Sequence, residues 1–137
     1  MIGHTTNVRV RYRDTDQMGV VYHGVYLEFF ETGRTELLRT CGMAYSNIER
    51  GGLLLPVLEA TLQIQRPARY DELIAVTATM HEPTGIRLLI QYQIHRGDLL
   101  LVSGSTTHVF TTADGMKPVR PPAGFLEVLR QGNQSAS

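Results

Sequence analysis

The chain has 137 residues and a mass of 15.3 kDa, which is enough for one domain with a hydrophobic core and too little for two. Hydrophobic residues make up 42% and charged residues 19%, as in ordinary globular proteins, and no apolar run reaches the ~18 residues that a membrane span needs. Thirteen basic and thirteen acidic residues cancel, so no net field would attract nucleic acid. We expect one domain over residues 1–137 that spans no membrane and binds no nucleic acid.

The expected compartment is the cytoplasm. Residues 1–5 lack the basic segment and apolar core of a secretory signal. The single cysteine, Cys41, cannot form an internal disulfide and agrees with a reducing environment.

The first predicted element is a strand over residues 8–13. Valine and tyrosine alternate there with arginine, which is the two-residue period of a strand with one apolar face. This alternation places Tyr12 on the same face as Val8. Residues 17–19, with a glycine at the end, predict a turn.

A long helix is predicted next, over residues 24–41. Apolar residues recur at spacings of three and four, and Gly42 follows the last of them, where a helix commonly ends in a left-handed conformation. The first half of this helix is apolar nearly all round. Other elements should therefore wrap it.

The rest of the chain changes to the period of strands. A short irregular or helical link is expected over residues 43–52, and a two-residue hairpin at Gly97-Asp98. A short helix over residues 123–130 and a polar, flexible tail over residues 131–137 should end the chain. The predicted strands are residues 58–65, 74–80, 86–94 and 99–112.

These elements predict an α+β fold of the order β-α-β-β-β-β. A five-stranded antiparallel sheet must curl around the one long helix to cover its apolar surface. We see no repeats and no second domain in the sequence.

Residues 14–26 carry acid, glycine and histidine just ahead of the long helix. The first N–H groups of a helix lack partners within it, so they polarise a carbonyl oxygen placed there. If Asp16 lies across from this terminus, its carboxylate can attack an acyl carbon or deprotonate water. The pattern predicts hydrolysis of an activated acyl compound, whereas turn statistics alone make Asp16 a turn residue.

The spacing of residues over the whole segment 9–26 indicates a function more specifically than Asp16 alone. It resembles the signature of the 4-hydroxybenzoyl-CoA/YbgC-like acyl-CoA thioesterases in the run Arg9-Val10-x4-Thr15-Asp16-x2-Gly19-Val20-Val21-x-His23-x2-Tyr26. The resemblance implies the hotdog fold, an acyl-CoA substrate, and no cofactor, since coenzyme A is part of the substrate. It also implies a homodimer, with active sites at the interface, that pairs into tetramers in many relatives. Exposed sheet edges give a physical reason for such pairing.

The resemblance assigns roles to individual residues. Asp16 matches the nucleophile or general base, and the N–H of His23 or Gly24 is the expected oxyanion donor. The His23 imidazole could position water or hold Asp16, with a structural role as the alternative, and a strand-end or cap role is expected for Asp14. The residues expected to contact substrate are Gly19, Tyr22, Tyr26, Arg66, Arg69 and Arg87, where solvated charge is the alternative for each arginine.

The remaining histidines predict no metal site. His4, His81, His95 and His108 fall on separate predicted elements, without the spacing of metal ligands.

Two other functions stay open. One is a hotdog dehydratase, which needs a histidine and an acid on the central helix; Glu28 and Glu31 are present, but the His-Phe-Pro-Gly-His type of run is absent. The other is a non-catalytic module that binds acyl-CoA or acyl carrier protein. The sequence leaves the acyl group itself open, with a short-chain or aromatic group expected.

Overall fold

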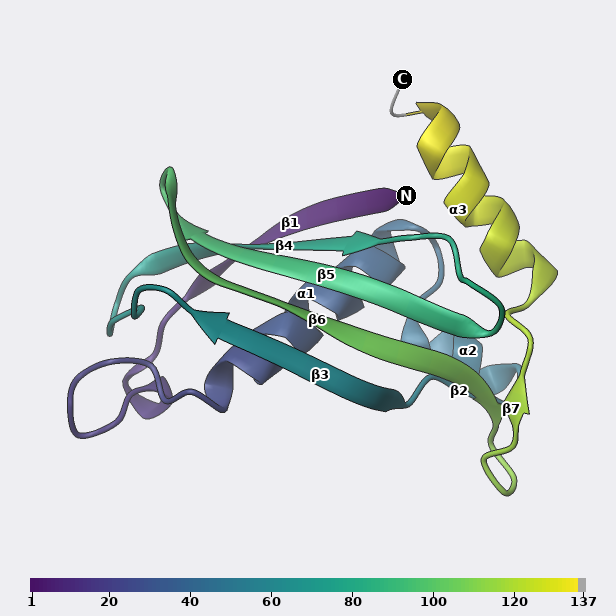
Figure 1. Cartoon of the computed structure of the whole chain (residues 1–137), viewed down its shortest axis with the longest axis horizontal. Helices are drawn as coiled ribbons and strands as arrows, with labels where there is room; N and C mark the ends of the chain where they lie inside the picture. Colours follow the sequence, from purple (N-terminus) through teal and green to yellow (C-terminus); the bar gives the residue numbers. More distant parts are fainter. Residues whose placement is uncertain (136–137) are drawn as a thin grey trace.

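The computed structural model describes residues 1–135, in which a long helix, α1 (Val25–Thr40), lies against one face of a curved antiparallel sheet (Figure 1). Its bounds lie within one residue of the predicted helix at each end. Gly42 has φ 74°, the left-handed conformation expected after the helix. None of the helices in the described residues has the length and apolar character needed to cross a membrane.

The five long strands lie in the order β1-β4-β5-β6-β3, and every pair is antiparallel. The predicted α+β hotdog architecture is therefore confirmed. The sheet has seven strands where five were predicted, because two two-residue strands extend the ladder of β6. The strands are β1 (Ile2–Arg9), β2 (Leu53–Leu54), β3 (Val57–Ile64), β4 (Leu73–Met80), β5 (Arg87–Arg96), β6 (Leu99–Thr112) and β7 (Pro118–Val119).

The prediction for the first strand was wrong in its position. β1 ends at Arg9, and the chain then closes into a short 3-10 helix, η1 (Tyr12–Asp14). The Asp14 carboxylate accepts the Arg11 backbone N–H at 2.8 Å and stabilises this turn. Tyr12 is consequently 78% exposed instead of buried beside Val8. The alternating side chains resemble a strand, but the local hydrogen bond decides the backbone.

Two further helices frame the sheet. Helix α2 (Tyr45–Arg50) falls in the link predicted as irregular or helical. Helix α3 (Ala123–Ser135) begins where predicted but is longer, so residues 131–135 of the predicted tail are helical, and residues 136–137 lie outside the described residues. Phe125 anchors α3 because its ring packs edge-on against Phe110 at 4.9 Å.

The core forms where α1 presses on the inner face of the sheet. Gly33 lets the helix approach β4 closely, since a Cβ there would lie 2.8 Å from Cγ1 of Val76. Gly104 of β6 makes room for Phe30, whose ring stacks on Tyr92 at 4.4 Å. These two glycines therefore set how deeply the helix sits.

A chain of buried polar groups crosses this core. Arg34 donates to the Tyr92 hydroxyl at 3.0 Å, which bonds Thr106 at 2.6 Å, which in turn bonds Nε2 of His108 at 2.8 Å. Burial and the charge of Arg34 lower the pKa of His108 to about 4. His108 is therefore a neutral structural residue near pH 7.

We predict that Gly104→Ala destabilises the fold. The new Cβ would collide with the carbonyl oxygen of Thr61 and lie 2.6 Å from the ring of Phe30, so the overpacking should lower the free energy of unfolding by about 1–3 kcal/mol. The matched control is Gly124→Ala in α3, where nothing lies within 4 Å of a new Cβ. Thermal unfolding should show a lower Tm for Gly104→Ala and an unchanged or higher Tm for Gly124→Ala. Equal Tm values for Gly104→Ala and wild type would contradict the packing described.

Candidate active site

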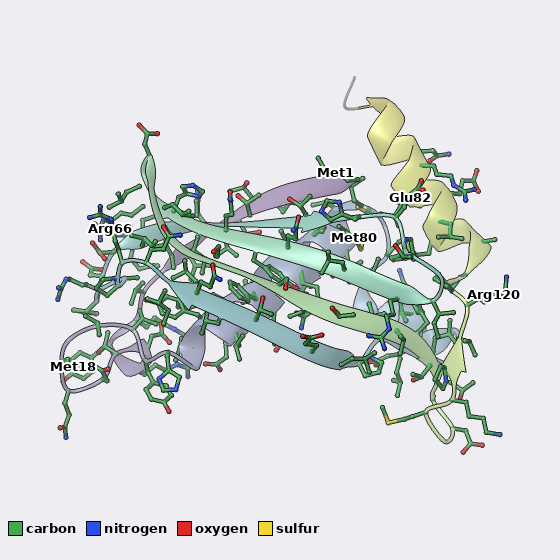
Figure 2. The ribbon with its side chains drawn as sticks, in the orientation of Figure 1. Met1, Met18, Arg66, Met80, Glu82 and Arg120 are labelled. Carbon is green, nitrogen blue, oxygen red and sulfur yellow. The ribbon has the colours of Figure 1, made fainter. Side chains whose placement is uncertain are left out.

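A short loop at one end of the molecule carries the predicted catalytic acid. The segment before Asp16 runs antiparallel to the segment after Gly19: Asp16 N–H donates to the Val20 carbonyl at 2.9 Å, and Tyr22 N–H donates to the Asp14 carbonyl at 2.9 Å. Gly19 N–H closes the turn on the Asp16 carbonyl at 3.0 Å, and its φ of 79° favours glycine. Figure 2 shows Met18, within this turn, at the same end as Arg66.

Asp16 also shapes its own turn. Its Oδ1 accepts the Met18 N–H at 2.8 Å, which is the side-chain contact typical of aspartate in turns. The side chain is half-buried, and within residues 1–135 no group is hydrogen-bonded to Oδ2. Asp16 therefore stabilises its own turn through Oδ1, and Oδ2 is left available for chemistry.

Helix α1 begins directly after this loop. The N–H groups of Val25, Tyr26 and Leu27 donate to the carbonyls three residues earlier. In the described chain no acceptor is hydrogen-bonded to the N–H of His23 or of Gly24. These two donors lie at the positive end of the helix dipole, as the sequence predicted.

The side chains around the helix start lie at the surface. His23 is exposed, and its ring lies 4.2 Å from that of Tyr22. The Tyr22 ring covers Gly24, since a Cβ at Gly24 would lie 3.1 Å from it. The two rings therefore flank the open N–H groups without bonding them.

Tyr26 occupies a different position from the one expected for a substrate contact. Its side chain is 1% exposed, and its hydroxyl accepts the Ala68 N–H at 3.0 Å. The Ala68 carbonyl accepts the Val21 N–H at 2.9 Å. Within one chain Tyr26 thus belongs to the core and links the helix to the loop.

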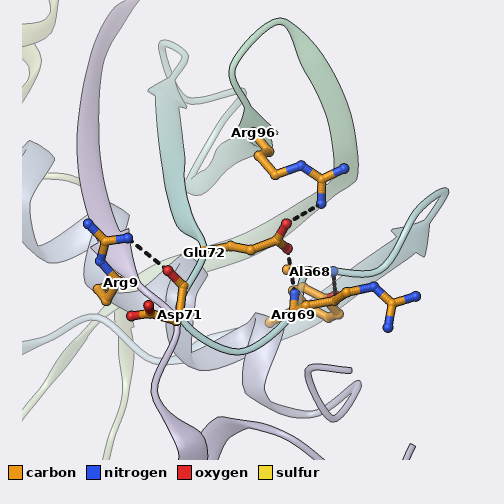
Figure 3. A network of polar contacts seen from close by, with 7 residues as sticks. Arg9, Ala68, Arg69, Asp71, Glu72 and Arg96 are labelled. Carbon is orange, nitrogen blue, oxygen red and sulfur yellow. Dashed lines mark hydrogen bonds and ion pairs between the residues drawn. The ribbon is translucent and has the colours of Figure 1, made fainter. Parts of the chain in front are cut away.

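Arg66 and Arg69 lie at the same end as Asp16. Both are exposed on the turn between β3 and β4, and Arg69 forms an isolated bridge with Val20 of the loop. Figure 3 shows the Arg69 guanidinium pointing away from the surrounding contacts, while its backbone N–H donates to Glu72 at 2.6 Å. Both guanidinium groups are therefore accessible to an anionic ligand.

Arg87 is not brought to this site within one chain. It pairs with Val109 of β6, whereas the turn of Arg66 is bonded to Leu101 of the same strand. These positions of β6 are eight residues apart, or about 26 Å along a strand. Within a single chain Arg87 therefore lies at the opposite end of the sheet from Arg66 and Arg69, and its predicted contact with substrate stays a prediction.

Two hollows of the surface do not include Asp16 in their lining, although the first reaches Asp14 and Val25. One, of about 400 Å³, lies beside the N-terminal half of α1 and includes Val8 and Glu28 in its lining. The other, of about 570 Å³, lies over the polar outer face of the sheet and includes Gln91 and Ser103. Among the described residues no cluster of His, Cys, Asp or Glu side chains could hold a metal ion.

The arrangement can act on a carbonyl group. A half-buried carboxylate lies on the loop that leads into α1, and two N–H groups without an acceptor in the described chain directly precede that helix. The carboxylate can supply a nucleophile or base, and the N–H groups can stabilise negative charge on oxygen. The sequence did not reveal Ala68 as an anchor of this site. Ala68 acts through its backbone N–H and C=O, and its side chain therefore gave no signal.

Comparison with known proteins shows which family the chain resembles. Residues 10–129 match the family described as the Thioesterase-like superfamily. The acyl-CoA thioesterase YbgC of Haemophilus influenzae is 35% identical over 88% of this chain and 89% of its own length. A hypothetical protein, TT1821, from Thermus thermophilus is 34% identical with a TM-score of 0.87, covering 93% of this chain and 97% of its own.

A third relative has a solved structure and a named substrate. The DHNA-CoA thioesterase of Staphylococcus aureus is 27% identical with a TM-score of 0.89, covering 100% of this chain and 97% of its own. Because the family match spans most of the chain and includes the Asp16 loop and α1, this protein belongs to the Thioesterase-like superfamily.

Proposed function

We propose that this protein hydrolyses acyl-CoA thioesters to a free acid and coenzyme A. The observation that carries the proposal is the half-buried Asp16 carboxylate, held by a tight loop beside a helix start with two unused N–H groups. The names of relatives support it, since YbgC of Haemophilus influenzae is an acyl-CoA thioesterase. A short-chain or aromatic acyl group is our proposed substrate class.

The proposed mechanism assigns one task to each part of the site. The carbonyl oxygen of the thioester binds the N–H groups of His23 and Gly24, which stabilise the negative charge that develops during attack. Asp16 either deprotonates a water molecule or attacks the carbonyl carbon itself, in which case water then hydrolyses the acyl-aspartyl anhydride. The C–S bond breaks, and coenzyme A leaves as a thiolate. A thiol ionises near pH 8.5, so this leaving group needs little help from a general acid.

We predict that Asp16→Asn lowers kcat by at least ~10²-fold, because the amide lacks the basicity and nucleophilicity of the carboxylate. The amide oxygen can still accept the Met18 N–H, so the loop and Tm should change little. Release of free thiol from a panel of acyl-CoA compounds measures the effect. If the wild-type protein releases no thiol from any of these compounds, the protein is a non-catalytic binding module and the proposed enzymatic function is wrong. Full activity in Asp16→Asn would remove Asp16 from the mechanism.

His23→Ala should cost less activity than Asp16→Asn. It removes an exposed imidazole but keeps the backbone N–H to which we assign the stabilisation of the oxyanion. The same thiol-release assay, with kcat and KM determined separately, compares the two variants. A loss in kcat as large as that of Asp16→Asn would give the imidazole itself an essential role.

We also propose that the active protein is a homodimer joined through β3. Within residues 1–135 only one edge of β3 is paired, with β6, and its side chains are mostly exposed on both faces, including Leu58 at 51%. A long, open, apolar edge strand is suited to pairing with a second copy. Two β3 strands paired antiparallel about a two-fold axis would bring the start of one beside the end of the other. This would place Arg87 of the partner subunit near Asp16, although the two are remote within one chain.

The dimer makes a testable assignment for Arg87. Arg87→Glu should raise KM for acyl-CoA ~10-fold, equivalent to about 1.4 kcal/mol, since it replaces a cation that would face the phosphates of coenzyme A. Co-expression of the Asp16→Asn and Arg87→Glu chains should restore one wild-type site in each mixed dimer. The mixed dimer should therefore show the wild-type KM and about half of the wild-type kcat, counted per dimer. Light scattering should give about twice the mass of one chain. A monomer, or a mixed dimer that keeps the raised KM, would refute the shared site.

A further inference from the structure

Ala68 connects the two halves of the proposed active site. Its C=O accepts the Val21 N–H from the Asp16 loop at 2.9 Å, and its N–H donates to the hydroxyl of Tyr26 in the first turn of α1 at 3.0 Å. Ala68 itself is completely buried. One residue thus joins the loop that carries the acid to the first turn of α1, which directly follows the proposed oxyanion donors.

The connection continues from Val21 to Asp16. Val21 forms an isolated bridge with Thr15, and Val20 accepts the Asp16 N–H at 2.9 Å. Val20 also forms an isolated bridge with Arg69, next to Ala68. A shift of Ala68 would therefore move the strand of the loop against which Asp16 is hydrogen-bonded.

The turn that contains Ala68 is braced on its other side. One oxygen of Glu72 accepts the Arg69 N–H at 2.6 Å, and the other accepts the Arg96 guanidinium of β5 at 2.7 Å (Figure 3). The Glu72 carbonyl accepts the Val10 N–H at 2.9 Å. The sheet thus fixes this turn, and Tyr26 is the side chain that ties it to α1.

The Tyr26 hydroxyl is well suited to act as this link. A tyrosine hydroxyl is protonated near pH 7. Burial raises the pKa of Tyr26 further, as do the carboxylates of Glu72 and Asp16, against the opposing effect of the Ala68 hydrogen bond. Asp16 is thus near enough for its charge to act on the hydroxyl.

We propose that the Tyr26 hydroxyl is a positioning residue, which sets the separation between the Asp16 carboxylate and the N–H groups of His23 and Gly24 by holding Ala68. The inference rests on the proposed thioesterase function. Tyr26 touches no reacting atom in this role, and its effect passes through the backbone of Ala68 and Val21. Attack on a carbonyl demands close alignment, so a shift of about 1 Å can cost ~10²-fold in rate.

Tyr26→Phe tests this role, and Tyr92→Phe is its matched control. Both tyrosines are 1% exposed, and both hydroxyls are hydrogen-bonded, but the Tyr92 hydroxyl bonds Arg34 and Thr106 instead of the turn. Each variant removes one buried hydroxyl and keeps the ring, so each should lower Tm. We expect kcat for acyl-CoA hydrolysis to fall ~10-fold or more in Tyr26→Phe with KM within twofold of wild type. In Tyr92→Phe, kcat should stay within twofold of wild type.

A second variant removes the same hydrogen bond from its other end. Ala68→Pro lacks the N–H and keeps the C=O that accepts Val21. If both residues act through this one hydrogen bond, the double variant Tyr26→Phe/Ala68→Pro should have a kcat no lower than that of the more impaired single variant. Should Ala68→Pro fail to fold, the comparison of the two tyrosine variants still decides.

Two outcomes overturn the proposal. A kcat within twofold of wild type for Tyr26→Phe would show that the hydroxyl does not position the site. If kcat falls equally in Tyr26→Phe and Tyr92→Phe, the loss comes from general loosening of the core and not from the Ala68 contact. Neither outcome touches the proposed function, which fails only if the wild-type protein releases no thiol.

Discussion

The burial of α1 against the inner face of the sheet is the constraint on which the rest of the structure depends. Gly33 lets the helix approach β4, and Gly104 admits the ring of Phe30 against β6 and Tyr92. Because cores are packed as densely as crystals, the helix has little freedom to slide or rotate. Its first turn is therefore fixed relative to the sheet, and so are the open N–H groups just before it.

The loop that carries Asp16 is held mainly by backbone hydrogen bonds. Val21 and Ala68, and Asp16 and Val20, are paired through main-chain groups, which leaves the side chains of His23 and Tyr22 exposed beside the helix start. Such a loop can be rigid without burying the groups that meet a ligand. The polar chain from Arg34 to His108 has the opposite character, since its groups are buried and bonded to one another. Polar side chains thus stabilise the core, and those at the end of the sheet stay exposed for the function that we propose.

The site has a partly open character in one chain. Arg66 and Arg69 reach its surface, yet Arg87 lies at the far end of β5, and the edge of β3 with Leu58 and Ile64 is uncovered. A two-fold axis at this edge would supply the missing cation and cover the apolar strand in one step. This is the physical reason why our proposed function includes a second copy of the chain.

The sequence alone determined the features that arise from local physics. The helix over α1, the turn from Asp16 to Gly19 and the hairpin at Gly97 follow from hydrophobic period and turn chemistry, which act between residues close in the chain. The place of Asp16 before a helix could be predicted for the same reason, whereas its role as the candidate acid rested on the resemblance of residues 9–26 to the thioesterase signature.

Only the tertiary structure decided which distant groups meet. The strand predicted through Tyr12 ends at Arg9 because a hydrogen bond from Arg11 to Asp14 outweighs the alternating pattern. The role of Ala68 was invisible in the sequence, since its backbone makes the contacts and its methyl group carries no chemistry. The separation of Arg87 from Asp16 likewise depends on strand register, which is set by pairing across the sheet and not by neighbours in the chain.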